Sequence, residues 1–336
     1  MLLIDRATVR EVYPLRDAIP VMAEAMRRYS SGQADLPLRT ILRPERDSGL
    51  LGTMPGFVAG ENLAGYGLKA MVLKPENPAR GLDLHIGVVL VFDPRTGAPL
   101  ALMDAGAVTA VRTAAVSAVA TDTLARRDAG DLAILGSGVQ ARSHLEAMRL
   151  VRPLRTVRLW SRTAANAEAY RSWAITALGI EPQVMSTPAL ALAGADLVCT
   201  TTAARQPIVR AEDLAPGAHV NAVGASFIDH RELSSAAVAK ATFFVDSRES
   251  ALAESGDLRA PVAEGLVGQD HIQAELGEVL LGKHAGRQRQ DEITVFKSLG
   301  LGVQDIMSGF AVAEAAAASG MGRTFEPGAD QQTNGD

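Results

Sequence analysis

The first third of the chain alternates between helix-like and strand-like patterns. Apolar residues over 17–31 recur on one face of a helix, and Gly32 is a typical C-terminal stop. The apolar run at 65–73 and two runs over 87–103, which flank the turn signal DPRTGA, predict strands, the latter pair as a β-hairpin. The small apolar residues of 107–126 predict a long helix that connects this part of the chain to the next.

From residue 131 onward, short apolar runs alternate regularly with helix-like segments. This rhythm predicts a parallel, doubly wound sheet with helices on both faces. The predicted strands are DLAIL, TVRLW, DLVCT, AHVNAVG and TFFVD. Residues 298–320 predict one helix, ended by Gly320, that returns to the first part of the chain. The expected fold class is α/β, with a Rossmann domain over 126–298, a discontinuous α+β domain over 1–125 plus 299–325, and a disordered tail over 326–336.

Composition narrows the class of protein. The 336 residues are 47% hydrophobic and 21% charged, with a net charge of −5, so we expect no nucleic-acid partner. A single cysteine, Cys199, allows no internal disulfide and is typical of a reducing compartment. We see no signal-peptide pattern and no apolar run near the roughly 18 residues of a membrane span. We therefore expect a cytoplasmic protein without a membrane partner.

A glycine-rich motif follows the first strand of the predicted parallel sheet. Its GxGxxA pattern lies between an apolar strand and an amphipathic helix, which is the context of a dinucleotide-binding loop. The first glycine permits a tight turn, the second lets the backbone approach a pyrophosphate, and the alanine allows close helix–strand packing. We expect the dinucleotide to bind here rather than a coincidental glycine turn. The residues are Gly136, Ser137, Gly138, Val139, Gln140 and Ala141.

The end of the next strand indicates which dinucleotide is bound. An acidic residue there would accept hydrogen bonds from the adenosine ribose and repel a 2′-phosphate. This chain instead has Ser161, Arg162 and Thr163, which offer a guanidinium and two hydroxyls to a phosphate. The sequence therefore favours NADP(H) over NAD(H), the alternative being that Arg162 is a solvated turn residue.

Isolated basic residues indicate a site for a small carboxylate. The chain has five lysines against 28 arginines, and Lys69 lies in the middle of the apolar run GYGLKAMVL. Arg112 is equally isolated in AVTAVRTAAVSAVA, and Arg39 precedes an apolar stretch. Burying such cations is costly unless each meets an anion. They either bind a substrate carboxylate or pair with carboxylates of the protein itself.

The remaining chemistry-bearing residues give weaker signals. His85 opens a hairpin strand, where a structural histidine is the default interpretation. Asp229 follows a strand of the parallel sheet at its carboxyl end, where such folds bind ligands, and is a candidate for the rim of the substrate site. We expect no metal, because Cys199 has no partner and the histidines lack paired ligand spacing.

An ordered set of segments resembles the ornithine cyclodeaminase/mu-crystallin family, with the mu-crystallin branch the more similar. The similarity extends from about Pro37 to Asp305. The matching segments are PLRT, LGTMPGF, DPRTGAPLALMD, VTAVRTAAVSA, ILGSGVQARSH, WSRTAANAE, GAHVNAVGAS, VDSRESALAESGD, AELGEVLLG and TVFKSLGLGVQD.

The resemblance implies a homodimer whose N-terminal domain binds substrate and forms the interface. It also implies that Arg39, Lys69 and Arg112 surround the substrate carboxylate, and that the segment of Arg162 is of the NADPH type. The residues implied to line the nicotinamide half of the cofactor are His85, Arg112, Thr113, Thr202, Ser226 and Ser298.

Two positions depart from the family pattern. Cyclodeaminases are expected to carry an aspartate for ring closure where this chain has Ser226, and Asp229, three residues later, does not inherit that role. Ring-closing deamination is therefore disfavoured, while imine reduction stays open. Phe227 stands where the mu-crystallin branch has an arginine, so we expect a changed preference, toward a more apolar or shorter imino acid.

The expected activity is NADPH-dependent reduction of α-imino acids, such as the cyclic ketimines Δ1-piperideine-2-carboxylate and Δ1-pyrroline-2-carboxylate, to L-amino acids. Lys69 is the candidate proton donor to the nitrogen, since burial near two arginines lowers the pKa of an ammonium. Three alternatives stay open. They are an NAD-dependent ornithine cyclodeaminase or alanine-dehydrogenase-like enzyme, a linear imine reductase that forms N-alkyl amino acids, and a non-catalytic NADPH-dependent ligand-binding protein.

Overall fold

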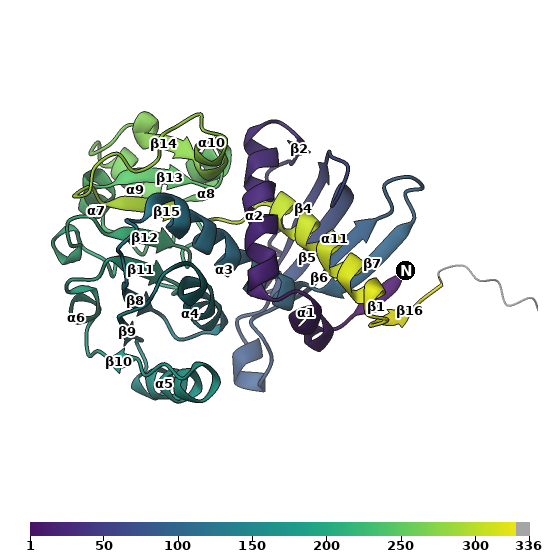
Figure 1. Ribbon diagram of the computed structural model, residues 1–336, viewed down its shortest axis with the longest axis horizontal. Helices are drawn as coiled ribbons and strands as arrows, with labels where there is room; N and C mark the ends of the chain where they lie inside the picture. Colours follow the sequence, from purple (N-terminus) through teal and green to yellow (C-terminus); the bar gives the residue numbers. More distant parts are fainter. Residues whose placement is uncertain (327–336) are drawn as a thin grey trace, which may run out of the picture.

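The computed structural model describes residues 1–326, which form two sheets side by side (Figure 1). The predicted tail therefore lies, apart from Glu326, outside the described residues. The first sheet runs in the order β16-β1-β7-β6-β5-β4-β2, with β3 paired to β4. Its strands are β1 (Leu2–Ile4), β2 (Ala34–Asp35), β3 (Thr40–Leu42), β4 (Leu50–Val58), β5 (Gly65–Leu73), β6 (His85–Phe92), β7 (Pro99–Asp104) and β16 (Arg323–Thr324).

The predicted hairpin is formed by β6 and β7, which pair antiparallel. Its turn is closed by the Asp93 carboxylate, which accepts hydrogen bonds from the backbone N–H groups of Arg95 and Thr96, each at 2.9 Å. Gly97 completes the turn at φ +73°, a conformation that glycine adopts without a steric penalty. The apolar run of 65–73 forms β5, as predicted.

Three long helices pack with the first sheet: α2 (Leu15–Ser30), α3 (Ala105–Leu124) and α11 (Gly302–Ala318). Of these, α11 packs on β4, β5 and β6. The predicted start of α11 was wrong, because residues 298–301 pass between the two sheets without forming helix. The N–H groups of Leu299 and Gly300 are held by the Asp246 carboxylate at 2.7 and 2.6 Å, and Gly300 has φ +81°.

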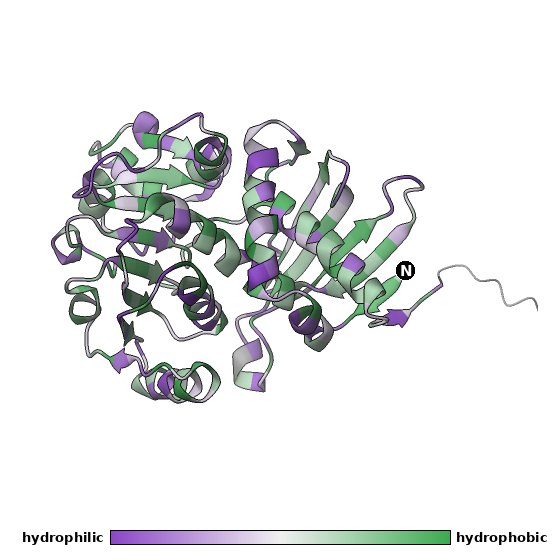
Figure 2. Cartoon of the chain, viewed as in Figure 1, coloured by the Kyte–Doolittle hydropathy of each residue, from purple (hydrophilic) through white to green (hydrophobic). Residues whose placement is uncertain are grey.

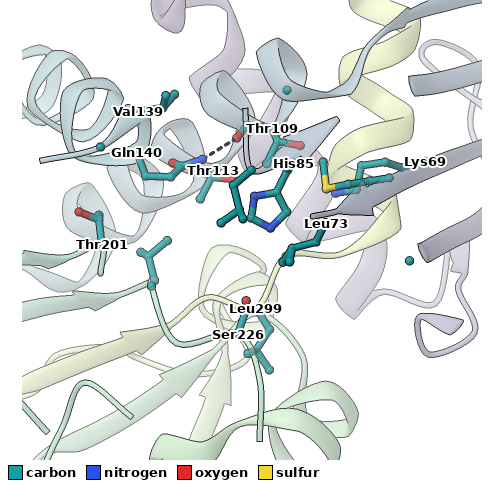
Figure 3. Close-up of a pocket in the computed structure, with 18 of the residues that line it drawn as sticks. Lys69, Leu73, His85, Thr109, Thr113, Val139, Gln140, Thr201, Ser226 and Leu299 are labelled. Carbon is teal, nitrogen blue, oxygen red and sulfur yellow. Dashed lines mark hydrogen bonds between the residues drawn. The ribbon is translucent and has the colours of Figure 1, made fainter. Parts of the chain in front are cut away.

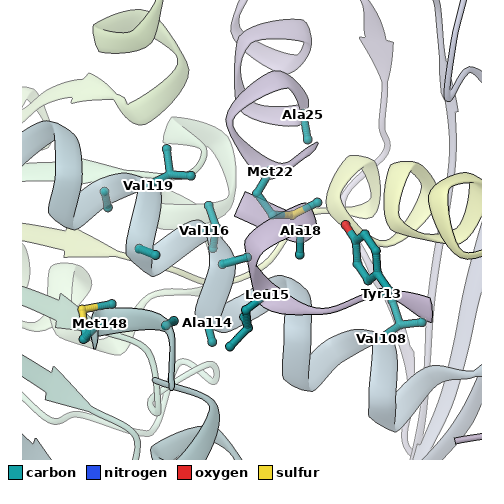
Figure 4. Close-up of a cluster of buried hydrophobic side chains, with 14 of the residues drawn as sticks. Tyr13, Leu15, Ala18, Met22, Ala25, Val108, Ala114, Val116, Val119 and Met148 are labelled. Carbon is teal, nitrogen blue, oxygen red and sulfur yellow. The ribbon is translucent and has the colours of Figure 1, made fainter. Parts of the chain in front are cut away.

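The apolar core continues through α3, which is buried over most of its length. Figure 4 shows Leu15 and Met22 of α2 packing toward α3, and Met148 of α4 (Val139–Val151) lying on the other side of it. A helix without a polar face is stable only when it is surrounded by protein. The predicted connecting helix therefore joins the two halves through packing as well as through the chain. The remaining elements of the first half are α1 (Arg6–Val12) and a short 3₁₀ turn at Asn77–Arg80.

The second sheet is parallel throughout and runs β10-β9-β8-β11-β12-β15-β13-β14, which confirms the predicted α/β class. The strands that the apolar runs predicted are β8 (Asp131–Leu135), β9 (Thr156–Trp160), β11 (Leu197–Thr200), β12 (His219–Ala222) and β13 (Thr242–Val245). Those that the sequence did not reveal are β10 (Gln183–Val184), β14 (Ile272–Glu275) and β15 (Thr294–Lys297). In Figure 2 the strands of this sheet are predominantly apolar.

The helices of the second half follow its strands. Besides α4, they are α5 (Ala164–Leu178), α6 (Pro188–Leu192), α7 (Ser235–Lys240), α8 (Arg248–Glu254), α9 (Gly256–Ala263) and α10 (Leu276–Leu280), with 3₁₀ turns at Ala211–Asp213 and Gln269–His271. Within residues 1–326, none of the helices combines the length and apolar character needed to cross a membrane.

Strand register decides where the loops of the second sheet meet. Leu135, Thr200, Ala222 and Lys297 are paired across neighbouring strands at their carboxyl ends. The segments that follow these residues therefore emerge together at one edge, the edge at which parallel sheets bind ligands.

Candidate functional site

A cavity of about 530 Å³ lies between that edge and the inner face of the first sheet. Figure 3 shows Lys69, Leu73 and His85 entering it from the first sheet, while Thr201 and Ser226 enter from loops of the second. The residues predicted as site residues that line it are Arg39, Lys69, His85, Arg112, Thr113, Gly138, Val139, Gln140, Thr202, Ser226 and Ser298.

Other predicted residues lie outside the wall of the cavity. Gly136 and Ser137 form the start of the glycine-rich loop, and the Ser137 hydroxyl lies 2.8 Å from the Ser161 hydroxyl at the end of β9. Arg162 and Thr163 follow Ser161 and are exposed. These five residues therefore extend from the cavity along the carboxyl edge of the sheet.

Asp229 does not line the cavity, which corrects its assignment to the rim of the substrate site. Its side chain is 59% exposed, and its carboxylate accepts a hydrogen bond from the Nδ1 of its neighbour His230 at 2.9 Å. The chain turns outward after Phe227, which does line the cavity, so two more residues carry Asp229 away from it.

Lys69 and Arg112 share one buried carboxylate, that of Asp305 in α11. Lys69 Nζ lies 2.7 Å from Oδ2 and Arg112 Nε lies 3.1 Å from Oδ1, while Arg112 Nη1 donates to Gln304 Oε1 at 2.8 Å. Asp305 is fully buried, and the two cations line the cavity. Two positive charges against one negative leave the pair able to attract an external anion.

The electrostatics of this group follow from burial. Burial, opposed by Asp305 and reinforced by the charge of Arg112, lowers the pKa of Lys69 to about 8. Burial acts to raise the pKa of Asp305, but Arg112 and Lys69 outweigh it and hold that pKa below its ordinary value. Asp305 is therefore ionised near neutral pH, while Lys69 is poised to exchange a proton.

Arg39, unlike Lys69 and Arg112, binds backbone carbonyls of the segment that connects the two sheets. Its Nε lies 3.0 Å from Glu254 Oε2, and its Nη2 donates to the carbonyls of Leu299 and Gly300 at 2.9 and 3.1 Å. Gly300 is also required locally, because a Cβ there would lie 2.6 Å from Arg112 Nη1. Each of the three isolated cations thus pairs with a carboxylate of the protein, as one interpretation predicted, and each also lines the cavity. That they bind a substrate carboxylate stays a prediction.

Basic residues dominate the charge of the wall. The basic side chains that line the cavity are Arg6, Arg10, Arg39, Lys69 and Arg112, whereas Asp83 is the acidic side chain among its described lining residues. Asp83 is itself paired with Arg6. Partial removal from water and the charge of Lys69 lower the pKa of His85, so this imidazole is neutral near pH 7. The cavity therefore favours a negatively charged ligand.

The glycine-rich loop has the geometry that a dinucleotide requires. Gly136 adopts φ +121°, and a Cβ there would lie 2.6 Å from the Thr201 hydroxyl. Gly138 is the N-cap of α4, so no side chain at that position caps the helix. No atom lies within 4 Å of where a Cβ would be. The N–H groups at the start of α4 are thus open to a phosphate.

Three buried polar atoms beside this loop have no partner in the protein: Thr109 Oγ1, Gln140 Oε1 and Ser298 Oγ. All three residues line the cavity. Buried polar groups are nearly always hydrogen-bonded, so these atoms are where a bound ligand would be expected to donate or accept. Together with the open N–H groups at the start of α4, these atoms fit a dinucleotide with its nicotinamide end in the cavity.

The part of the cavity wall that β3, β4 and β5 form is apolar apart from Lys69. Alternate residues of β4 and β5 face inward, and the lining side chains are Ile41, Leu50, Met54, Met71, Leu73 and Leu84. Phe227 adds an aromatic ring from the second half, and the Arg43 guanidinium lies 5.2 Å from its centroid. This wall fits the hydrocarbon part of a ligand whose carboxylate meets the cations.

Sequence reasoning missed several residues of the site. Asp305 is an isolated acid in an apolar helix, so the argument applied to Lys69 would have found it. Thr109 lies one turn before Arg112 on α3, but a threonine in a helix carries no distinctive signal. Among the described residues, no three His, Cys, Asp or Glu side chains are close enough together to hold a metal ion.

A parallel sheet with an open glycine-rich loop beside a cation-lined cavity defines the class of dinucleotide-dependent enzymes. The comparison with protein families is more specific. The model of the ornithine cyclodeaminase/mu-crystallin family matches residues 2–320. The chain belongs to this family.

Named relatives are similar to this chain over most of its length. The Δ1-pyrroline-2-carboxylate reductase of Bacillus cereus is 38% identical over 327 residues, covering 97% of this chain and 100% of the relative. Ketimine reductase mu-crystallin of Mus musculus is 42% identical over 293 residues, covering 86% and 89%. The structure of Thermococcus litoralis Δ1-pyrroline-2-carboxylate reductase in complex with NADH and L-proline has a TM-score of 0.93 and 37% identity, covering 97% and 100%.

Proposed function

We propose that the protein reduces α-imino acids with NADPH, in particular the cyclic ketimines Δ1-pyrroline-2-carboxylate and Δ1-piperideine-2-carboxylate, to L-amino acids. Membership of a family whose relatives include named imine and ketimine reductases makes the chain an NAD(P)H-dependent imine reductase. The observation that carries the finer proposal is the position of Lys69 and Arg112, which share one carboxylate and line the cavity together with the glycine-rich loop.

In this proposal the substrate carboxylate binds Lys69 and Arg112, with Arg39 holding segment 299–300 beside them. Each charge-assisted hydrogen bond to a carboxylate contributes about 1.5–3 kcal/mol. A bound nicotinamide supplies a hydride to the α-carbon. The protein positions that carbon through the carboxylate clamp and through the apolar side chains next to Lys69 on the same face of the sheet, Met54 and Met71.

Lys69 is proposed as the proton donor to the imine nitrogen. Hydride transfer needs an electrophilic carbon, so the C=N group reacts as an iminium after taking a proton from Nζ. Addition of the hydride then gives the amine, and Lys69 regains its proton from water. A pKa of about 8 makes Lys69 mostly protonated at pH 7 yet a much stronger acid than an ordinary lysine.

NADPH is proposed over NADH because of the segment after β9. Arg162 and Thr163 are exposed, and Thr163 is the N-cap of α5 but makes no side-chain cap. A guanidinium and two hydroxyls at a helix N-terminus form a suitable site for a 2′-phosphate. The cofactor residues proposed are Gly136, Ser137, Gly138, Val139, Gln140, Ser161, Arg162 and Thr163, with His85, Arg112, Thr113, Thr202, Ser226 and Ser298 at the nicotinamide end.

A homodimer formed through the first sheet is also proposed. The face of β5 and β6 opposite the cavity side carries apolar side chains that are exposed in the single chain, and Tyr66, at 62%, is the most exposed of them. The others are Val72, Ile86 and Val88. Contiguous apolar surface of this kind is typical of an interface. A cytoplasmic location stays a prediction that rests on the sequence.

The test is oxidation of NADPH and NADH, followed by nicotinamide absorbance, with each of the two cyclic imines. We expect rapid oxidation of NADPH, little of NADH, and formation of L-proline or L-pipecolate. Oxidation with a 2-oxo acid and an alkylamine, but not with the cyclic imines, would replace the proposal with linear imine reduction. Ammonia release from L-ornithine with NAD would replace it with cyclodeamination, and tight NADPH binding without turnover of any imine would leave a ligand-binding protein.

A further inference from the structure

A second buried ionic group lies beneath the loops that form the nicotinamide end of the cavity. Glu232, Asp257 and Lys297 are each fully buried, although they come from separate elements. Lys297 ends β15, Asp257 lies in the first turn of α9, and Glu232 follows the loop that leaves β12. None of the three lines the cavity.

Glu232 accepts hydrogen bonds from two different loops. Its Oε1 accepts from the backbone N–H and the hydroxyl of Thr202, both at 2.7 Å. Its Oε2 accepts from the Thr200 hydroxyl at 2.7 Å and from the Gly224 N–H at 2.8 Å. One carboxylate thus joins the segment after β11 to the segment after β12, and Thr202 and Gly224 both line the cavity.

Lys297 and Asp257 anchor the far side of the same loop. Lys297 Nζ lies 2.9 Å from Asp257 Oδ2 and donates to the Ala225 carbonyl at 2.6 Å, directly before Ser226. Asp257 Oδ1 accepts from the N–H groups of Glu232 and Leu233 at 2.8 and 2.9 Å. Lys297 is followed by Ser298, whose buried hydroxyl has no partner.

The loops have little room to shift around Glu232. A Cβ at Gly224 would lie 2.1 Å from the Thr202 carbonyl oxygen and 2.6 Å from Glu232 Oε1. Burying three ionisable groups is costly unless each is fully hydrogen-bonded, and an apolar cluster would serve stability at least as well. The arrangement therefore indicates that these groups serve to hold the loops in a fixed position and not only to stabilise the fold.

We propose that Glu232 is a positioning residue that fixes Thr202 and the Gly224–Ser226 loop at the spacing that the nicotinamide end of the cofactor requires. The proposal rests on the proposed function, in that it takes this end of the cavity as the place where the nicotinamide binds. Glu232 itself touches neither cofactor nor substrate. Its carboxylate acts through the hydrogen bonds to Thr202 and Gly224. The Asp257–Lys297 pair, which meets Glu232 at its backbone N–H, holds Ala225 next to Ser226 independently of that carboxylate.

The experiment compares three variants of the full-length protein. Glu232→Gln cannot accept at both oxygens, so it leaves the Gly224 or Thr202 N–H without a partner. Thr200→Val removes one donor to Glu232, and Thr200 does not line the cavity. Glu292→Gln is the matched control, since Glu292 is also buried and accepts a backbone N–H, that of Gln288, but precedes β15 at the opposite end of the sheet.

The readouts are the Kd for NADPH by fluorescence titration, the KM for NADPH and for the imine, kcat, and Tm. We expect Glu232→Gln to raise the Kd and KM for NADPH on the order of tenfold, the equivalent of about 1.4 kcal/mol. Thr200→Val moves both in the same direction by less. The KM for the imine at saturating NADPH stays near wild type, because Lys69 and Arg112 are untouched.

Two results would overturn the inference: NADPH binding and kcat within about twofold of wild type in a folded Glu232→Gln, or an equal loss of NADPH affinity in Glu292→Gln. If Glu232→Gln does not fold, Thr200→Val decides, and an unchanged Kd there counts against the inference. Failure of the proposed reaction is recognised separately, since wild type would then bind NADPH without oxidising it while the variants still shifted the Kd.

Discussion

The two buried ionic groups are built from the same components but differ in what they face. Each has a lysine at an inward position of a strand, Lys69 in β5 and Lys297 in β15, and each lysine lies within 3 Å of a buried aspartate. Around Lys69, a second cation shares the aspartate. Around Lys297, a second carboxylate, that of Glu232, is near enough to interact with the charges of both Lys297 and Asp257.

The difference in charge balance matches the difference in location. Lys69 and Arg112 line the cavity with one carboxylate between them, so we expect an anion from outside to complete the group. Lys297 does not line the cavity, and the carboxylates of Asp257 and Glu232 already hold the surrounding loops. In both cases a lysine in an apolar strand indicates a buried carboxylate of the protein. A net positive charge, as around Lys69, indicates in addition a site for an anionic ligand.

The largest effect is expected from Lys69→Met. If Lys69 donates the proton, kcat falls about 10²–10⁴-fold, the usual contribution of general acid catalysis. Stability falls by only about 1–3 kcal/mol, because Arg112 still pairs with Asp305. Steady-state kinetics and thermal unfolding check both expectations.

The control for that variant is Lys74→Met, on the same strand-and-loop segment. Lys74 is an exposed partner of Asp47, so kcat is expected to stay within about twofold of wild type. If Lys69→Met keeps its kcat at saturating substrate and only its KM for the imine rises, Lys69 belongs to the carboxylate clamp alone.

Lys297→Met is expected to reduce stability more than Lys69→Met does. It leaves Asp257 and Glu232 buried without a cation, which costs about 3–5 kcal/mol of unfolding free energy. Denaturant unfolding measures this loss, which should exceed that of Lys69→Met. An equal or larger loss in Lys69→Met would mean that the two lysines are not distinguished by their surroundings.

Arg162→Ala extends the comparison to an exposed cation. We expect the KM for NADPH to rise about 10–100-fold, corresponding to the loss of one charge-assisted bond, and the KM for NADH to stay nearly unchanged. Arg171→Ala, an exposed arginine of α5 paired with Glu181, should change neither KM. An equal effect of Arg162→Ala on both cofactors would contradict a 2′-phosphate site.

The periodicity of apolar residues predicted those helices and strands whose positions depend on the local sequence. The apolar run of β5, the hairpin of β6 and β7, and the helix of α3 all lie where periodicity placed them. β15 was missed because it is short and follows a polar stretch, and nothing local indicates that it inserts between β12 and β13. The start of α11 was misplaced because Asp246, far away in sequence, binds the N–H groups of Leu299 and Gly300 and keeps them out of the helix.

The site was partly predictable for the same reason. Lys69 and the glycine-rich loop are recognisable because their local surroundings make them anomalous or form a motif. Asp305, Glu232 and Lys297 acquire their roles only when separate elements meet, although each is a charged residue beside apolar neighbours. Asp229 was misjudged because its distance from a strand end does not reveal that the loop turns outward after Phe227.

The most direct test of the account is the dependence of kcat on pH for imine reduction, measured in wild type and in Lys69→Met. Burial lowers the pKa of Lys69 to about 8, and the protonated form is the acid. The account predicts that kcat in wild type falls as the pH rises through about 8, and that the variant lacks this decline. A decline that persists unchanged in Lys69→Met would assign the titration to the substrate or another group, and would contradict the role of Lys69 as proton donor.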